Sequence, residues 1–306
     1  MITTSEKRVP LGKKIRAHIE LADPVTWISP AIVTLFGALA SGQEVGFQWT
    51  SGRDWAMALL GALVCGPLGT GFSQSINDYF DRDIDAINDP ERPIPAGLVT
   101  LSEARLNWIV LGSATFLVSL IFGNPLISLL AVLGIILSVL YSMPPVKLKK
   151  HFFLGPPAVG LGYVGMSWMV GHLIFAPLTW ESVLVALING TLASGMLFLN
   201  DIKSVEGDRL HGLQSLTVVI GVQKTLIIAF LTINLSQVLL LALAILWGYY
   251  WVAALILFAI VAPIRNQVQL YYEPNQKNYL RYLVTSNPFV VLIQIVSALM
   301  VGGYFG

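Results

Sequence analysis

The chain has 306 residues, of which 55% are hydrophobic and 11% are charged, and its net charge is +1. Soluble domains carry about a quarter of their residues as charges, so this composition excludes an ordinary soluble protein. The single cysteine, Cys65, excludes a disulfide framework and a cysteine-based metal site. The sequence therefore predicts an all-α polytopic membrane protein, and its balanced charge carries no information about partners.

Nine apolar runs approach the length of about 20 residues that a bilayer span requires. They are residues 25–41, 56–76, 105–122, 125–141, 156–175, 181–200, 221–246, 250–266 and 285–304. With nine spans, every Lys and Arg except Arg53 falls on one face, which the positive-inside rule makes cytoplasmic. We expect a cytoplasmic segment, 1–24, with a short interfacial helix from Leu11 to Leu21, and a single nine-helix membrane domain, 25–306. The N-terminus is then cytoplasmic and the C-terminus lies on the opposite side.

An acidic stretch follows the second expected span. Five aspartates and one arginine occupy the thirteen residues from Asn77 to Asp89. Carboxylates at the end of a membrane helix are costly unless a cation neutralises them. If the helix continues past residue 76, Asn77, Asp81 and Asp85 share one face. An amide oxygen and two carboxylates on one face favour a hard cation such as Mg²⁺.

A second acidic stretch, residues 200–209, follows the sixth expected span. Asp201 and Asp208 share a face if the backbone stays helical, and Glu206 is a further candidate ligand. Two acidic stretches on the same side of the membrane indicate a divalent metal and a polyanionic substrate. The alternative for these carboxylates is a solvated loop whose aspartates cap helices.

Cationic side chains near the acidic stretches are candidates for binding a diphosphate. They are Arg82, Arg92, Lys147, Lys149, Lys203 and Arg209. For Lys147 and Lys149 the alternative is a role in topology or in contact with anionic lipid. Tyr141 precedes these lysines and is a candidate catalytic residue, with a place in an interfacial aromatic belt as its alternative.

The motifs together resemble a known family. The strings NDxxDxxxD, RPIPAG, YSxPPxK and NDxKSxEGDRxxGxQSL are similar to those of the UbiA-type intramembrane prenyltransferases. The strings at 85–88, 92–95 and 200–216 look most like the chlorophyll and bacteriochlorophyll synthases within that superfamily. The resemblance implies a UbiA-type bundle whose cytoplasmic loops, 77–104 and 201–220, are catalytic.

The resemblance also implies a reaction. The propionate of a (bacterio)chlorophyllide is esterified with a prenyl diphosphate, geranylgeranyl or phytyl, and diphosphate is released. The implied Mg²⁺ ligands are Asn77, Asp81, Asp85, Asp201 and Asp208, with Glu206 as a further candidate. The implied catalytic residues are Asp81, Asp85, Asp201, Asp208 and Tyr141.

Two residues bear on the acceptor. Ser204 stands where many members of the superfamily have a further aspartate, which we interpret as a sign of an acceptor carboxylate that needs no general base. His172 is a candidate ligand for the central Mg of a chlorin, with an interfacial position as the alternative.

The expected setting is the inner membrane of a phototrophic bacterium, with the site facing the cytoplasm. Besides the two substrates and the bilayer, association with other pigment-biosynthesis proteins and the oligomeric state stay open, and we expect no nucleic acid. Two alternatives are another UbiA-type transferase, acting on a quinone precursor or haem, and a transporter or channel. The latter requires ionisable groups along the spans.

Overall fold

The computed structural model describes residues 9–42, 44, 46–151, 153–200, 202 and 216–304. These residues form helices joined by short loops, and no strand occurs among them. The α-helices are α1 (Leu11–Leu21), α2 (Ile28–Ala40), α3 (Gly52–Leu63), α4 (Gly71–Asn88), α5 (Leu101–Ser119), α6 (Pro125–Ser142), α7 (Gly155–Gly160), α8 (Ser167–Leu173), α9 (Trp180–Phe198), α11 (Leu216–Ile220), α12 (Val222–Leu246), α13 (Tyr250–Val261), α14 (Ile264–Tyr272) and α15 (Gln276–Val301). Short 3₁₀ turns are η1 (Pro24–Trp27), η3 (Leu120–Phe122) and η4 (Leu148–Lys150), and π-helical segments are η2 (Val64–Thr70) and η5 (Leu161–Met166).

Seven helices in the described ranges are long and apolar enough to cross a membrane. They are Gly52–Asn88, Leu101–Phe122, Pro125–Ser142, Trp180–Phe198, Val222–Leu246, Tyr250–Tyr272 and Gln276–Val301. An eighth candidate joins Leu11–Leu21 to Pro24–Ala40 with a bend of 45°. The expected span 156–175 corresponds to the helix formed by α7, η5 and α8, which is rich in glycine and is not among the seven. The chain is therefore an all-helical, multi-pass membrane protein.

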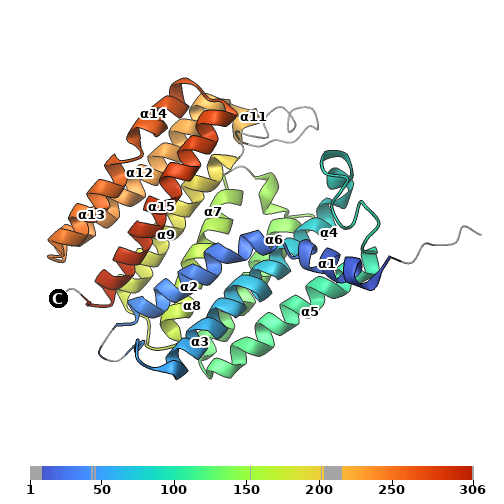
Figure 1. Ribbon diagram of the computed structural model, residues 1–306, viewed down its shortest axis with the longest axis horizontal. Coiled ribbons are helices and arrows are strands. Elements are labelled where there is room, and N and C mark those ends of the chain that lie inside the picture. Colours follow the sequence, from blue (N-terminus) through green and yellow to red (C-terminus); the bar gives the residue numbers. More distant parts are fainter. Residues whose placement is uncertain are drawn as a thin grey trace, which may run out of the picture.

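The helices differ in how far they are enclosed by the rest of the bundle. The most apolar part of α9 is 56% buried, whereas those of α5 and α6 are each 17% buried. Figure 1 shows α12 to α15 on one side of the bundle and α1, α4 and α5 on the other, with α2, α7 and α8 between them. The main core cluster packs α2 and α8 against α9, α12, α13 and α15.

The backbones of α2 and α8 touch because glycines stand at their crossing. A Cβ on Gly37 would lie 2.0 Å from the carbonyl oxygen of Trp168, and one on Gly171 would lie 1.9 Å from that of Thr34. Small residues at helix crossings in membranes allow this close approach. Larger side chains at either glycine would separate two helices that both contribute to the cavity described below.

Helices α3 and α4 form one continuous helix through the π-helical segment η2. Its 37 residues correspond to a length of about 55 Å, which exceeds the roughly 30 Å of a hydrocarbon core. The extra length is the polar end of α4, which carries the first acidic stretch. A second π-helical segment, η5, interrupts the helix that contains α7 and α8.

The N-terminal helix α1 has the expected bounds and is held against α4 and α5. Near its C-terminal end, the backbone carbonyl of Leu21 accepts a hydrogen bond of 3.3 Å from Ser75 Oγ. The carbonyl of His18 accepts one of 3.4 Å from Asn107 Nδ2. On the opposite side of α1, an apolar stripe begins at Leu11, whose exposed fraction is 74%. This stripe faces away from the bundle. This stripe fits the expected interfacial position of α1.

Candidate active site

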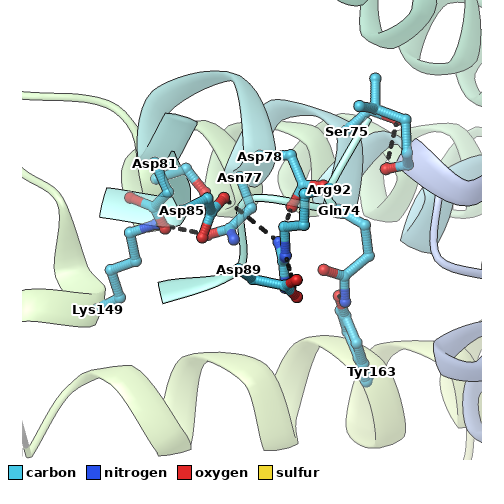
Figure 2. Close-up of polar contacts among 12 residues, drawn as sticks. Gln74, Ser75, Asn77, Asp78, Asp81, Asp85, Asp89, Arg92, Lys149 and Tyr163 are labelled. Atoms are coloured by element: carbon cyan, nitrogen blue, oxygen red, sulfur yellow. Dashed lines mark hydrogen bonds and ion pairs between the residues drawn. The ribbon is translucent and has the colours of Figure 1, made fainter. Parts of the chain in front are cut away.

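The end of α4 presents the first acidic stretch as a helical face. Because α4 continues to Asn88, the condition for Asn77, Asp81 and Asp85 to share a face is met. Figure 2 shows these side chains close together, with Lys149 and Arg92 approaching them. The helix therefore brings one amide and several carboxylates into one polar cluster.

Two lysines from the loop after α6 bind this cluster. Lys149 Nζ donates to Asn77 Oδ1 at 2.5 Å and also forms an ion pair with Asp81. Lys147 Nζ lies 3.0 Å from Asp81 Oδ1, and its side chain is only 10% exposed. Burial lowers the pKa of Lys149, while the nearby Asp81 carboxylate opposes that shift. The loop thus delivers two buried cations to one carboxylate.

Lys147 also has an unusual backbone conformation. Its φ of 41° lies in the left-handed region, which residues other than glycine rarely adopt. Such conformations cluster at functional sites because the surrounding structure has to hold them in place. The ion pair with Asp81 is one contact that holds Lys147 in this conformation.

Arg92 binds the other carboxylates of α4. Its Nη1 lies 2.6 Å from Asp78 Oδ1 and 3.4 Å from Asp85 Oδ2, and its Nε lies 3.5 Å from Asp89 Oδ2. Burial disfavours the charge of the guanidinium, but the three carboxylates outweigh burial and raise the pKa of Arg92. Arg92 therefore ties the loop after α4 back to the acidic face.

Arg82 points to a different side of α4. Its Nη1 donates to the backbone oxygen of Tyr79 at 2.9 Å, and its guanidinium stacks over the Tyr79 ring. Its nearest carboxylate is the exposed Asp83, at 3.7 Å. Among the expected diphosphate-binding residues that the structure describes, Arg82 is the one that does not contact Asn77, Asp81 or Asp85.

The second acidic stretch is described only at its edges. Asp201, Lys203, Glu206, Asp208 and Arg209 lie outside the described residues, as does Ser204. Asn200 is described, and its Oδ1 accepts a hydrogen bond of 2.7 Å from the Tyr279 hydroxyl of α15. Asn77 and Asn200, which begin the two acidic motifs, both line one large cavity.

This cavity has a volume of about 810 Å³ and extends from the two asparagines into the bundle. Its walls come from η1 and α2, η2 and α4, α6, α7 to α8, α9 and α15. None of the described residues that line it is an Asp, Glu, Lys, Arg or His. Tyr141 lines the cavity from the last turn of α6. The charged groups thus lie at the mouth and the interior is neutral, unlike an ion path along the spans.

Residues 31–287 match the sequence profile of the UbiA prenyltransferase family. The chain belongs to this family. It is 36% identical over 290 residues to the chlorophyll synthase of Avena sativa, covering 93% of this chain and 76% of that protein. It is 35% identical over 271 residues to the bacteriochlorophyll synthase 34 kDa chain of Chloroflexus aurantiacus, covering 85% and 84% of the two chains. The resemblance expected from the motifs is confirmed.

A solved UbiA homologue from Archaeoglobus fulgidus, bound to DMAPP and Mg²⁺, shares the fold. It superposes with a TM-score of 0.63 at 18% identity, covering 93% of this chain and 98% of that one. At this level of identity the likeness concerns the fold, and the Mg²⁺ and DMAPP belong to that homologue.

The described part of the site fits a hard cation. No three Asp, Glu, His or Cys side chains in the described ranges form a metal cluster by themselves. However, the buried Asp81 Oδ1 accepts no hydrogen bond, and its neighbour is the Lys147 ammonium at 3.0 Å, so this oxygen already faces a positive charge. With the amide oxygen of Asn77 and the carboxylate of Asp85, it offers oxygen ligands of the type that Mg²⁺ prefers. These residues amount to half of the expected ligand set, and the other half lies in the second stretch.

One polar pair inside the cavity was not predicted from the sequence. Gln74 Nε2 donates to the Tyr163 hydroxyl at 3.3 Å, which connects α4 to η5 one turn below Asn77 (Figure 2). Tyr163 lies in the fifth expected span, and the sequence gives no sign that it faces Gln74. The π-helical segments on both elements also left no recognisable signal in the sequence.

His172 is fully occupied by neighbours. Its Nε2 donates to the backbone oxygen of Pro177 at 3.0 Å, because a carbonyl can only accept. Its Nδ1 therefore accepts from the Ser182 hydroxyl at 2.9 Å, and Trp168 Nε1 donates to the same hydroxyl at 3.1 Å. With 1% of its surface exposed, His172 has no ring nitrogen free for the metal of a chlorin.

Proposed function

We propose that this protein esterifies the propionate of a (bacterio)chlorophyllide with a prenyl diphosphate, geranylgeranyl or phytyl, and releases diphosphate. Relatives at 33–36% identity are named as chlorophyll and bacteriochlorophyll synthases. The observation that carries the proposal is the arrangement of charge. Asn77 and Asn200, which begin the two acidic motifs, both line a neutral cavity large enough for membrane-soluble substrates.

In this proposal the oxygen ligands at the mouth hold Mg²⁺. They are Asn77, Asp81, Asp85, Asp201 and Asp208, with Glu206 as a further candidate. When bound, Mg²⁺ supplies positive charge that stabilises the diphosphate leaving group. In the described part, Asp81 and Asp85 also hold the cations of the mouth in place through Lys147, Lys149 and Arg92.

The cations divide into two roles. Lys147 and Lys149 lie at the cavity mouth, where their ammonium groups neutralise the oxygens of the departing diphosphate. Lys203 and Arg209 of the second stretch are proposed to do the same, and Arg82 would join them by releasing the backbone oxygen of Tyr79. Arg92 acts mainly by orienting Asp78 and Asp85. In the arrangement described, each of these cations except Arg82 thus either meets the leaving group or fixes the groups that bind it.

The neutral cavity supplies the conditions for the transfer step. The ring of Tyr141 lines it near the mouth, where its π-face can stabilise positive charge that develops on the allylic carbon. The acceptor carboxylate is ionised near neutral pH, so it attacks without a general base, in keeping with serine at position 204. Apolar walls exclude water, which would otherwise compete for the allylic carbon.

We further propose an orientation for the chain in the membrane. Nine spans, with the helix formed by α7, η5 and α8 as the fifth, put the N-terminus and both acidic stretches on the cytoplasmic side and the C-terminus on the other. Residues 1–24 then form a cytoplasmic segment, and 25–306 form one membrane domain with catalytic loops 77–104 and 201–220. The inner membrane of a phototrophic bacterium is the proposed location.

The test is an assay of the purified full chain in lipid nanodiscs. Chlorophyllide and bacteriochlorophyllide are each combined with geranylgeranyl or phytyl diphosphate, with and without Mg²⁺, and a parallel arm offers 4-hydroxybenzoate as acceptor. We expect a Mg²⁺-dependent pigment ester and no prenylated benzoate. Prenylation of the benzoate alone, or no ester with any pigment, would overturn the proposal.

A further inference from the structure

Two walls of the cavity differ in their polar groups. The wall formed by α6 is mainly aliphatic from Ile127 to Leu137, whereas α15 contributes the amides of Asn287 and Gln294. These two residues are seven positions apart, so they lie on one face of α15, separated by about two helical turns. The cavity therefore has an apolar side and an amide-bearing side.

Gln294 is buried in the membrane region without a hydrogen-bonding partner. Its exposed fraction is 5%, and neither Gln294 nor Asn287 forms a side-chain hydrogen bond in the described part of the chain. By contrast, the amides of Gln267 and Asn234 hydrogen-bond each other at 3.3 and 3.4 Å. An amide in an apolar layer without a partner is costly, so its position on the cavity wall indicates a ligand with hydrogen-bond acceptors.

The amide-bearing side is also where the cavity reaches the outer surface. At their C-terminal ends α2 and α15 touch, since a Cβ on Gly302 would lie 2.5 Å from the carbonyl oxygen of Leu39. Before this contact along each helix, residues from both helices line the cavity and remain exposed, with Ile28 at 58% and Val291 at 45%. Figure 1 shows the two helices converging at the lower left. The amides therefore lie beside a part of the cavity wall whose residues are exposed on the outside of the bundle.

We propose that Gln294, together with Asn287, recognises the acceptor by donating hydrogen bonds to carbonyl oxygens on the edge of its macrocycle. This inference rests on the proposed function and assigns the acceptor to one wall of the site. A prenyl tail has no hydrogen-bond acceptor and gains nothing from an amide, whereas a chlorophyllide carries a ring ketone and a methyl ester. Gln294 is assigned to the ring ketone and the aliphatic wall of α6 to the tail.

Binding of chlorophyllide to the full chain in nanodiscs, without Mg²⁺ or prenyl diphosphate, tests this assignment. Quenching of pigment fluorescence reports the dissociation constant, so the measurement does not depend on turnover. Gln294→Leu is expected to raise the Kd about 10-fold, the usual effect of losing one hydrogen bond to a buried group. The matched control is Gln267→Leu, the same substitution at an amide that is paired outside the cavity, and it should leave the Kd within about twofold of wild type.

A second arm replaces the ketone of the acceptor with a methylene group. The wild-type chain should bind this derivative about 10-fold more weakly than chlorophyllide, and Gln294→Leu should weaken it no further, because the interaction is already absent. An unchanged Kd for chlorophyllide in Gln294→Leu overturns the inference, as does an equal loss with both acceptors. Failure of the wild-type chain to esterify any chlorophyllide overturns the proposed function instead.

Discussion

The mouth of the site and the cavity beneath it contrast in how they treat charge. At the mouth, five charged side chains of the cluster, Asp78, Asp81, Asp85, Lys147 and Lys149, are packed within bonding distance of opposite charges. One turn further in, the described lining has no charged group, and its polar atoms are amides and hydroxyls. The fold thus separates a charged region from a neutral one, and in the proposed function the first binds the anionic leaving group and the second holds the apolar reactants.

Neutralising one carboxylate at the mouth should have the largest effect. Asp81→Asn removes a charge that binds both lysines and that is proposed to bind Mg²⁺, so we expect turnover to fall by about 10³-fold or more. Ester formation at saturating substrates measures the change. Asp83→Asn is the control, because its side chain is 85% exposed and, among the described residues, pairs only with Arg82. Activity of Asp81→Asn close to that of Asp83→Asn would mean that the acidic face is not catalytic.

In the cavity, activity should depend on the volume of the side chains that line it and not on charge. A Cβ on Gly134 of α6 would meet only the Met166 methyl at 3.9 Å, so the cavity has room there. Gly134→Phe fills that space, and we expect kcat/KM to fall by about 100-fold through lost positioning of the substrates. Gly134→Ala is the matched control and should keep nearly full activity while favouring the helix. Thermal unfolding in detergent checks that the phenylalanine variant is folded. If the folded variant turns over substrate at the normal rate, no substrate lies against that wall.

The smallest effect is expected for the contact that ties the loop to the acidic face. Arg92→Met should lower kcat about 10-fold, since Asp78 and Asp85 lose their shared partner. A double-mutant cycle with Asp78→Asn separates two roles for Arg92. A positioning role predicts that the double variant is little worse than either single variant, because both changes break the same contact. Strictly additive losses would place Arg92 on the diphosphate itself.

Much of this architecture was predictable from local chemistry. The apolar runs located the helices because a bilayer requires long stretches without charge, and the spacing of Asn77, Asp81 and Asp85 was informative because α4 does not break after Ile76. Lys147 and Lys149 were identified as candidates from their place in the loop, and both contact Asp81. The periodicity of α4 and the positions of charged residues were therefore enough to predict the cluster around the first acidic stretch.

Other features depend on contacts between distant segments and left no local signal. Helix α15 begins at Gln276, nine residues before the expected span, because its polar first turns are packed on the bundle through Tyr279 and Asn200. The engagement of Arg92 with Asp78 and of His172 with Ser182 likewise joins residues that only the fold brings together. The second acidic stretch stays a prediction, since its ligands lie outside the described residues.

The π-helical segment η2 has a consequence for how the chain tolerates insertion and deletion. A π turn holds one residue more than an α turn, so the helix after Thr70 is rotated relative to the helix before Val64. Removing a single residue from η2 would restore an α turn and rotate everything beyond it by about 100°. Every proposed ligand of α4 would remain in the sequence, yet Asn77 would face away from the cavity. The site thus depends on the length of this segment as well as on the identity of its carboxylates.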